Sequence, residues 1–231
     1  MQRILSVAAI VLFALIFASI AIGYGGQQAL RPLAESYVRL VPLELGAPNV
    51  ITGILLTYRA FDTLGEVAVL FMVAAGVGLV LGVTAKSPGA EDPEAERKTP
   101  ASEIIQSATQ ILVPLISIFA AYIIMNGHIS AGGGFQGGAV IASAVMLLLL
   151  ANPSLVLNTA FLSITESAAG VSFVLVGIAG LIFAGGFLDN RVLPLGEFGA
   201  FFSAGAIPVL SVLLGVKVGC ELAVILDSFR T

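Results

Sequence analysis

The chain has 231 residues, of which 58% are hydrophobic and only 10% are charged, and its formal net charge is −4. Soluble domains carry about 25% charged residues, so this composition excludes a soluble globular protein. Its apolar runs are continuous and several approach the roughly 20 residues of a membrane helix, which excludes a β-barrel. The sequence therefore predicts an all-α integral membrane protein in the lipid bilayer. No basic cluster is present, so nucleic acid is not expected as a partner.

The apolar runs predict six transmembrane helices and one half-buried, interfacial helix. The first span covers about 4–22, and its length favours a retained helix over a cleaved signal peptide. The mixed segment 27–45 predicts a short surface helix with turns, and the apolar segment 49–58 is too short to cross the membrane. The other five spans are expected at about 59–83, 100–125, 135–151, 163–187 and 198–226.

A strongly polar run from Lys86 to Pro100 divides the chain. Its prolines and charges predict a solvent-exposed linker. The expected organisation is a two-span segment at 1–85, a linker at 86–99 and a four-span domain at 100–231.

Four short signals predict helix ends and bends. Thr99-Pro100 is typical of a helix start, and Ser163-Ile-Thr-Glu166 has the spacing of a capping box that would begin the fifth span. Pro114 is expected to kink the third span, and Pro208 is expected inside the sixth.

The most unusual stretch runs from Asn126 to Ala139. It holds the only histidine, His128, and a cluster of glycines. Consecutive glycines are costly to order and are expected where φ is positive or where another backbone comes close. The stretch predicts a tight hairpin between two spans, with Gly134 and Gly138 spaced for close helix contact. The glycines of this hairpin are Gly132, Gly133, Gly134, Gly137 and Gly138.

This stretch also carries a family resemblance. Gly127-His128 followed by the run 132–138, Gly-Gly-Gly-Phe-Gln-Gly-Gly, resembles the B subunit of Mrp-type multisubunit sodium/proton antiporters. The same module occurs in the membrane arms of membrane-bound hydrogenases and related respiratory complexes. The resemblance covers roughly 99–227. It departs at Ile129-Ser130-Ala131, where members of the family often have Asn-Ala-Pro.

A second segment is similar to another component of the same complexes. The string from Tyr58 to Glu66, Tyr-Arg-Ala-Phe-Asp-Thr-Leu-Gly-Glu, resembles the C-terminal part of the large A subunit. The resemblance implies that two neighbouring family segments are joined in one chain. It also implies that the partners are other membrane subunits of an Mrp-type complex.

Ionisable residues inside membrane spans are costly and therefore mark candidate functional sites. Lys217 and Glu221 are four residues apart in the last span and share a helix face. Gly215 and Gly219 lie on the roughly opposite face, where they would allow close packing. The pair is either part of a proton or sodium path, or a neutralised pair that fixes this helix against a neighbouring subunit.

A second candidate cluster contains Arg59, Asp62 and Glu66 at the start of the second span. Asp62 and Glu66 are spaced to face each other across one helical turn, which suits an ion path. The alternative is that Thr63-x-x-Glu66 is a capping box and that the carboxylates stabilise a helix N-terminus.

Three further ionisable residues have simpler interpretations. His128 could carry protons because its ordinary pKa is close to neutral, or it could hydrogen-bond the glycine turn. Glu103 and Glu166 are both interpreted as first-turn capping residues. Cys220 is the single cysteine, and no metal-ligand spacing, phosphate loop or nucleophile–base pair is found, so no metal, cofactor or catalytic residue is expected.

The leading hypothesis is a non-catalytic membrane subunit of a multisubunit complex that moves sodium ions or protons. The fused segment and the string around Lys217 and Glu221 favour a redox-driven respiratory complex of hydrogenase or sulfur-reductase type. The alternatives are a component of a stand-alone antiporter, a passive scaffold and a self-sufficient transporter. Loop charges favour cytoplasmic N- and C-termini in the plasma membrane. The upstream assignments would reverse if 49–58 crossed the bilayer.

Overall fold

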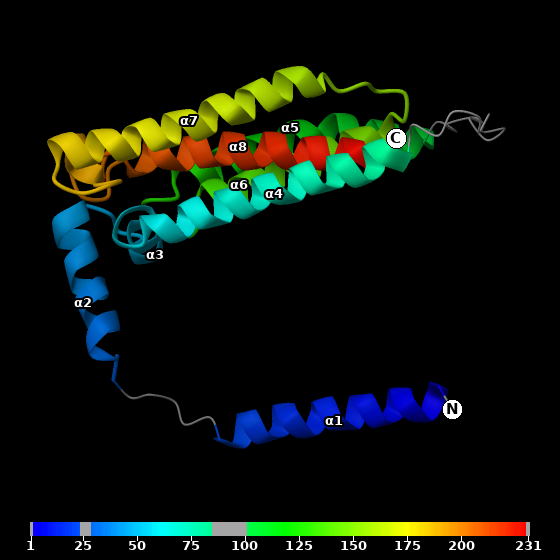
Figure 1. Cartoon of the computed structure of the whole chain (residues 1–231), viewed down its shortest axis with the longest axis horizontal. Coiled ribbons are helices and arrows are strands. Elements are labelled where there is room, and N and C mark those ends of the chain that lie inside the picture. Colours follow the sequence, from blue (N-terminus) through cyan, green and yellow to red (C-terminus); the bar gives the residue numbers. More distant parts are fainter. Residues whose placement is uncertain (1, 24–28, 85–100, 230–231) are drawn as a thin grey trace. The chain divides into compact units, whose positions relative to one another are not determined.

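The computed structural model describes residues 2–23, 29–84 and 101–229, and all its regular elements in these ranges are helical (Figure 1). The predicted linker 86–99 and the Thr99-Pro100 signal therefore lie outside the described residues. Six helices are long and apolar enough to cross a membrane, which confirms the predicted number. They are α1 (Gln2–Gly23), α4 (Ala60–Thr84), α5 (Glu103–Met125), α6 (Gly134–Ala151), α7 (Thr159–Phe183) and α8 (Ile207–Ser228).

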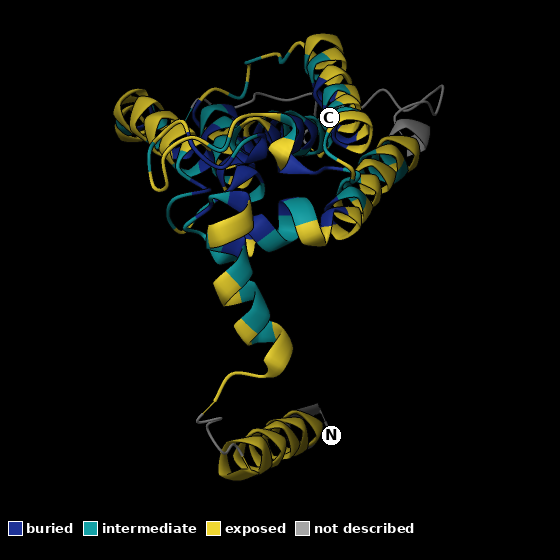
Figure 2. Cartoon of the chain, turned by 90° about the vertical axis from the view of Figure 1, so that its left-hand side faces the viewer, coloured by how far each residue is buried: buried dark blue, intermediate teal, exposed yellow. Residues whose placement is uncertain are grey.

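The chain divides into two compact units, residues 1–36 and 37–231. Within the first unit, α1 is apolar along its length, and its large side chains from Leu5 to Ile22 are exposed (Figure 2). Burying such side chains is the main source of helix stability in water, so α1 requires lipid or another protein around it.

Helix α8 lies at the centre of the larger unit. It packs against α4, α5, α6 and α7, and half of the residues in its most apolar 18-residue stretch are buried. Ten of its residues are buried, among them Leu210, Leu214, Val218 and Glu221. Ala206 precedes the helix and Pro208 lies in its first turn, where proline needs no hydrogen-bond donor. Pro208 therefore lies inside the span as predicted, but the predicted start of the span at about 198 was wrong, because 198–206 forms an irregular loop.

Between α1 and α4 in the sequence, the described residues form a series of short helices. These are α2 (Pro32–Leu40), η1 (Val41–Leu45), α3 (Val50–Gly53) and η2 (Ile54–Tyr58). The part 32–45 meets the part 50–58 at 80°, as in a broken span or a re-entrant loop. Thr52, Gly53 and Leu56 are buried while Ile51 is exposed, which agrees with the predicted half-buried helix.

This segment shares one apolar core with the last two spans. Val41, Leu45 and Leu56 belong to the same buried cluster as Phe173 of α7 and Leu210 of α8. Residues far apart in the sequence therefore fold as one body, and burial of each such side chain contributes about 1.5–3 kcal/mol.

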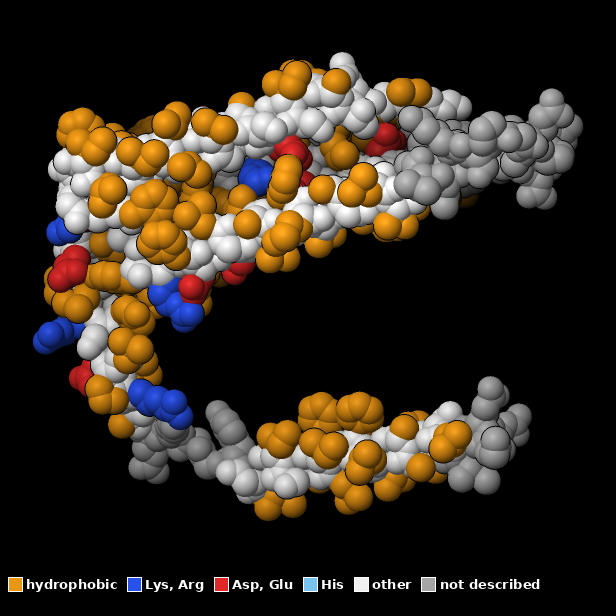
Figure 3. Space-filling model, viewed as in Figure 1, with side chains coloured by type: hydrophobic (Ala, Val, Ile, Leu, Met, Phe, Trp, Pro, Cys, Tyr) orange, Lys and Arg blue, Asp and Glu red, His pale blue; other side chains and the backbone are white. Residues whose placement is uncertain are grey.

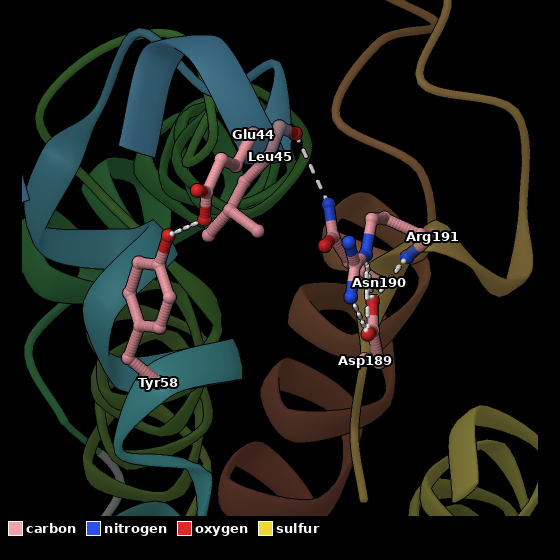
Figure 4. A network of polar contacts seen from close by, with 6 residues as sticks. All are labelled: Glu44, Leu45, Tyr58, Asp189, Asn190 and Arg191. Carbon is pink, nitrogen blue, oxygen red and sulfur yellow. Dashed lines mark hydrogen bonds and ion pairs between the residues drawn. The ribbon is translucent and has the colours of Figure 1, made fainter. Parts of the chain in front are cut away.

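Polar contacts fasten the same segment to the loop between α7 and α8 (Figure 4). The fully buried Asn190 donates its side-chain amide to the carbonyl oxygens of Leu45 and Ala204, both at 3.0 Å. Beside it, Asp189 accepts a hydrogen bond of 2.9 Å from the Arg191 Nε atom, and this bond keeps the pKa of Asp189 below its usual value. Asn190 thus provides a buried polar link across 145 residues of sequence.

Two predicted helix starts differ from the structure. Helix α5 begins at Glu103 with Ser102 as its N-cap, so Glu103 lies in the first turn as expected. Helix α7 begins at Thr159 with Asn158 as its N-cap. The proposed capping box at Ser163–Glu166 was wrong, because the better N-cap residue Asn158 stands one turn earlier and places Glu166 well inside the helix.

Candidate functional site: a buried charge cluster on α8

The glycine hairpin sets the position of α8. A Cβ atom added at Gly134 would lie 2.7 Å from the Leu214 Cβ atom, and one at Gly138 would lie 2.8 Å from the Val218 Cβ atom. Contacts below 3.0 Å do not occur for real side chains, so only glycine allows α6 to approach α8 this closely. The predicted close helix contact at Gly134 and Gly138 is confirmed.

The other glycines of the hairpin close the turn onto α5. Gly132 and Gly133 have φ of +155° and +150°, and a Cβ atom at Gly132 would lie 2.8 Å from the Ile123 carbonyl oxygen. Gly137 faces Ile124 of α5 in the same way. The hairpin therefore holds α5, α6 and α8 together by backbone approach.

Lys217 and Glu221 form a buried ion pair on α8, the helix that these glycine contacts position. The Lys217 Nζ atom is 2.9 Å from the Glu221 Oε2 atom, and the two side chains are 8% and 0% exposed. The Lys217 Nζ atom also lies 5.9 Å from the centre of the Phe71 ring on α4, within range of a cation–π contact. The predicted charge pair is thus present, and it is buried at the middle of a span.

Glu166 of α7 belongs to the same cluster. It is 8% exposed and lies close enough to Lys217 and Glu221 to interact with both charges. Figure 3 shows basic and acidic side chains next to each other on the face between α7 and α4, which is otherwise apolar. Glu166 was not predicted as a member of this cluster because its spacing matched a capping motif. The missed signal was its depth, since it lies well inside a span rather than at its end.

The second candidate cluster is split between two environments. Arg59 and Asp62 form an ion pair whose side chains are 61% and 46% exposed. Thr63 is buried and donates a hydrogen bond of 2.8 Å to the Leu55 carbonyl oxygen. The proposed capping box at Thr63–Glu66 is therefore wrong, because α4 already begins at Ala60 and the Thr63 hydroxyl bonds a carbonyl oxygen of the preceding helix η2 instead.

Glu66 lines a groove of about 590 Å³ that is bordered by η2, α4, the start of α6 and α8. Gln136 and Ser211 also line this groove, and the buried Ser211 hydroxyl has no hydrogen-bond partner among the described residues. No ion pair of Glu66 is found among the residues that the structure describes. The groove is mainly apolar, with one carboxylate on its wall.

His128 is fully buried in the turn after α5. Neither ring nitrogen makes a hydrogen bond of good geometry, although backbone groups of Met125, Ala200 and Phe201 lie close enough to favour the charged form. Burial has the larger effect and lowers the pKa of His128 below 6.5. The expected hydrogen bond from the His128 side chain to the glycine turn is not found in the described structure.

This lowered pKa predicts an acid-sensitive fold. Below pH 6.5 the unfolded chain binds a proton that buried His128 does not, so the free energy of unfolding falls as pH decreases through this value. We expect denaturant titrations in detergent to show this loss between about pH 7.5 and 5.5. A His128→Gln variant should lack it; an equal loss in that variant would assign the effect to other groups.

The backbone around His128 is held by Asn49, the N-cap of α3. The Asn49 side chain donates to the carbonyl oxygens of Gly127 at 2.8 Å and Ser130 at 2.7 Å, and it accepts hydrogen bonds from Ile51 and Thr52. The backbone N–H of Asn49 donates a hydrogen bond of 3.0 Å to the His128 carbonyl oxygen. Asn49, together with the Thr52 hydroxyl that donates to the same Gly127 carbonyl oxygen at 2.7 Å, thus fixes the half-buried segment onto the glycine hairpin.

Asn49→Ala should destabilise the protein more than loss of an ordinary cap. A cap contributes about 1 kcal/mol, and loss of the hydrogen bond to the Ser130 carbonyl oxygen adds about 1 kcal/mol or more, whereas the Gly127 carbonyl oxygen keeps a hydrogen bond of 2.7 Å from the Thr52 hydroxyl. Asn158→Ala is the matched control, because Asn158 caps α7 through Phe161 and is exposed. Equal free energies of unfolding for the two variants would show that the contacts to the hairpin contribute nothing.

Comparison with known proteins decides the family. Residues 104–224 match the family described as "Domain related to MnhB subunit of Na+/H+ antiporter". The chain belongs to this family. It is a multi-pass membrane protein, and the resemblance to the B subunits of Mrp-type antiporters is confirmed.

Characterised and uncharacterised relatives cover different shares of the chain. An uncharacterized protein of Methanocaldococcus jannaschii is 30% identical over 74% of this chain and 72% of its own length. The B subunit of the Na(+)/H(+) antiporter of Bacillus subtilis is 37% identical over 35% of this chain and 51% of its own. A probable K(+)/H(+) antiporter A/B subunit of Rhizobium meliloti is 31% identical over 55% of this chain, but this is only 16% of that protein.

Two solved structures share the fold over nearly the whole chain. A chain of the membrane-bound sulfane sulfur reductase, an archaeal respiratory membrane complex, superposes with a TM-score of 0.81 at 32% identity and covers 99% of this chain and 97% of its own. A chain of the Mrp complex from Dietzia sp. DQ12-45-1b gives a TM-score of 0.76 at 22% identity, with 98% and 26% covered. The second match shows the fold alone.

Proposed function

We propose that the protein is a non-catalytic membrane subunit of a redox-driven respiratory complex whose membrane arm contains an Mrp-type cation/proton translocation module. The observation that carries this proposal is the match to a sulfane sulfur reductase chain over 97% of that chain. Both segments of this protein find their counterpart there in one polypeptide of similar length. In the Mrp complex the corresponding fold is only 26% of a much longer chain.

The partners in this proposal are other membrane subunits. Side chains along α4, α5 and α7 are exposed and apolar, so these helices require lipid or neighbouring helices around them. We place the polypeptide in the plasma membrane, with both termini on the cytoplasmic side. We also propose that 1–85 and 100–231 correspond to two family segments joined by the linker 86–99.

The ion path in this proposal centres on Lys217 and Glu221. A charge pair at the middle of a membrane helix is retained at a cost of at least about 2.5–3.5 kcal/mol per charged side chain, which favours a functional role. The pair is neutral when both side chains are ionised, which lowers the cost of keeping two ionisable groups at this depth in the membrane. Glu66 in the groove, Asp62 at the helix start and buried His128 remain secondary candidates for the path of sodium ions or protons.

The proposal is tested by isolating the intact complex from native membranes with an affinity tag on this chain. Mass spectrometry is expected to find both membrane subunits and soluble subunits with iron–sulfur or nickel–iron centres. A complex of membrane subunits alone would support the stand-alone antiporter instead. If the purified chain by itself moved sodium ions or protons in liposomes, the proposed role within a larger complex would fail.

A further inference from the structure

The buried cluster on α8 contains one more negative group than positive groups. Its ionisable members are Lys217 and Glu221 of α8 and Glu166 of α7, with the neutral thiol of Cys220 nearby. None of the three charged residues is more than 8% exposed. If all three were ionised, the cluster would hold an unbalanced negative charge inside the membrane, which is far more costly than a neutral cluster.

The geometry of the two helices places the carboxyl groups opposite each other. Helices α7 and α8 are antiparallel (Figure 1). A Cβ atom at Gly170 would lie 3.6 Å from the Lys217 Cδ atom, so these two positions face each other. Glu166 lies one turn before Gly170 on α7, and Glu221 lies one turn after Lys217 on α8. Because the helices are antiparallel, Glu166 and Glu221 are at the same height along the helix pair.

One oxygen of this site is left without a partner. Glu221 uses Oε2 to bind Lys217, whereas its buried Oε1 atom has no hydrogen-bond partner among the described residues. The Glu166 carboxyl group likewise shows no hydrogen bond in this part of the chain. A buried carboxylate oxygen without a donor is costly, because it has lost its hydrogen bonds to water and gained none in return. A proton on either carboxyl group would remove the excess negative charge of the cluster.

We propose that Glu166 and Glu221 share one exchangeable proton, so that the cluster with Lys217 is neutral and forms a proton-binding site within the membrane. Two buried carboxylates that face each other do not both ionise. A proton fits better than a metal ion, since the described residues contain no group of three acidic, histidine or cysteine side chains placed to hold one. The site deepens the proposed function, because this proton is the one that the path through Lys217 and Glu221 would move.

Infrared spectroscopy tests the site separately from transport. In the purified complex in sodium-free buffer at neutral pH, we expect a carbonyl stretch of a buried, protonated carboxyl group. Glu166→Gln and Glu221→Gln should each remove it, because each leaves one carboxylate to balance Lys217. Lys217→Met should raise it about twofold, since both carboxyl groups then stay protonated. Glu103→Gln, a carboxyl group in an exposed first turn of α5, is the matched control.

The outcomes separate the site from the function. A band that is unchanged in Glu166→Gln, or that is missing from the original protein in sodium-free buffer, would overturn the shared proton. If the band were absent and the addition of sodium ions changed the infrared spectrum, the site would be assigned to a metal cation. Loss of the band in both variants establishes the proton site; if transport by the complex were then unaffected by Glu166→Gln, the proposed function would fail while the site remained.

Discussion

Replacement of Lys217 by methionine is expected to abolish ion transport by the assembled complex and to weaken the fold. The substitution removes the only cation of a cluster whose two carboxyl groups are at most 8% exposed. Removing one partner of a buried ion pair costs about 3–5 kcal/mol, because the carboxyl group left behind must be protonated to avoid an uncompensated buried charge. Denaturant titration of the purified protein in detergent measures this loss, and pH-sensitive dyes in proteoliposomes measure transport.

The double variant Lys217→Met/Glu221→Leu separates function from stability. Replacing a buried ion pair by apolar side chains of similar volume is often neutral or stabilising, so the free energy of unfolding should return to within about 1 kcal/mol of the original. Transport should stay absent, because Lys217 and Glu221 are gone and Glu166 alone has no partner with which to exchange a proton. Transport that recovered together with stability would show that the pair only holds α8 in place, and the scaffold hypothesis would gain.

An exposed ion pair in the same chain provides the control. Arg59 and Asp62 are three residues apart in sequence and about half exposed. Pairs of this kind contribute about 0–1 kcal/mol. Arg59→Ala/Asp62→Ala should therefore change the free energy of unfolding little. If it also abolished transport, the cluster at the start of α4 would have to be included in the ion path.

The helices themselves could be predicted because composition and run length determine them. A membrane excludes unpaired backbone groups, so continuous apolar runs can only form helices, and all six were found. The boundaries were less certain because they depend on single residues. Pro208 is compatible with both a helix interior in a membrane and a first turn, and local sequence does not distinguish the two.

The charge cluster could be predicted only in part, for a related reason. Lys217 and Glu221 lie on one helix, so their spacing alone predicts that they meet. Glu166 lies on another helix, and its approach to them depends on how α7 packs against α8. Likewise, the contact between Asn49 and the hairpin joins residues about 80 positions apart, and no local periodicity contains that information.

Substitution of Gly134 by alanine is expected to separate α6 from α8. The added methyl group would overlap the Ser211 carbonyl oxygen and would lie 3.0 Å from the Gly215 nitrogen, so backbone atoms rather than flexible side chains would have to move. Overpacking of a tight contact costs about 1–3 kcal/mol and sometimes more. The loss should appear in denaturant titrations in detergent, and as reduced incorporation of the chain into the complex.

Gly76→Ala is the matched control because the same methyl group would meet nothing within 4 Å on α4. Alanine is favoured over glycine inside a helix by about 1 kcal/mol, so this variant should be as stable as the original or slightly more stable. The contrast matters for the charge cluster, since the glycine contacts fix the position of α8, the helix that carries Lys217 and Glu221. Gly134→Ala should therefore also change the infrared signal of the Glu166–Glu221 carboxyl pair. An unchanged fold and an unchanged signal would mean that close approach of α6 does not position the site.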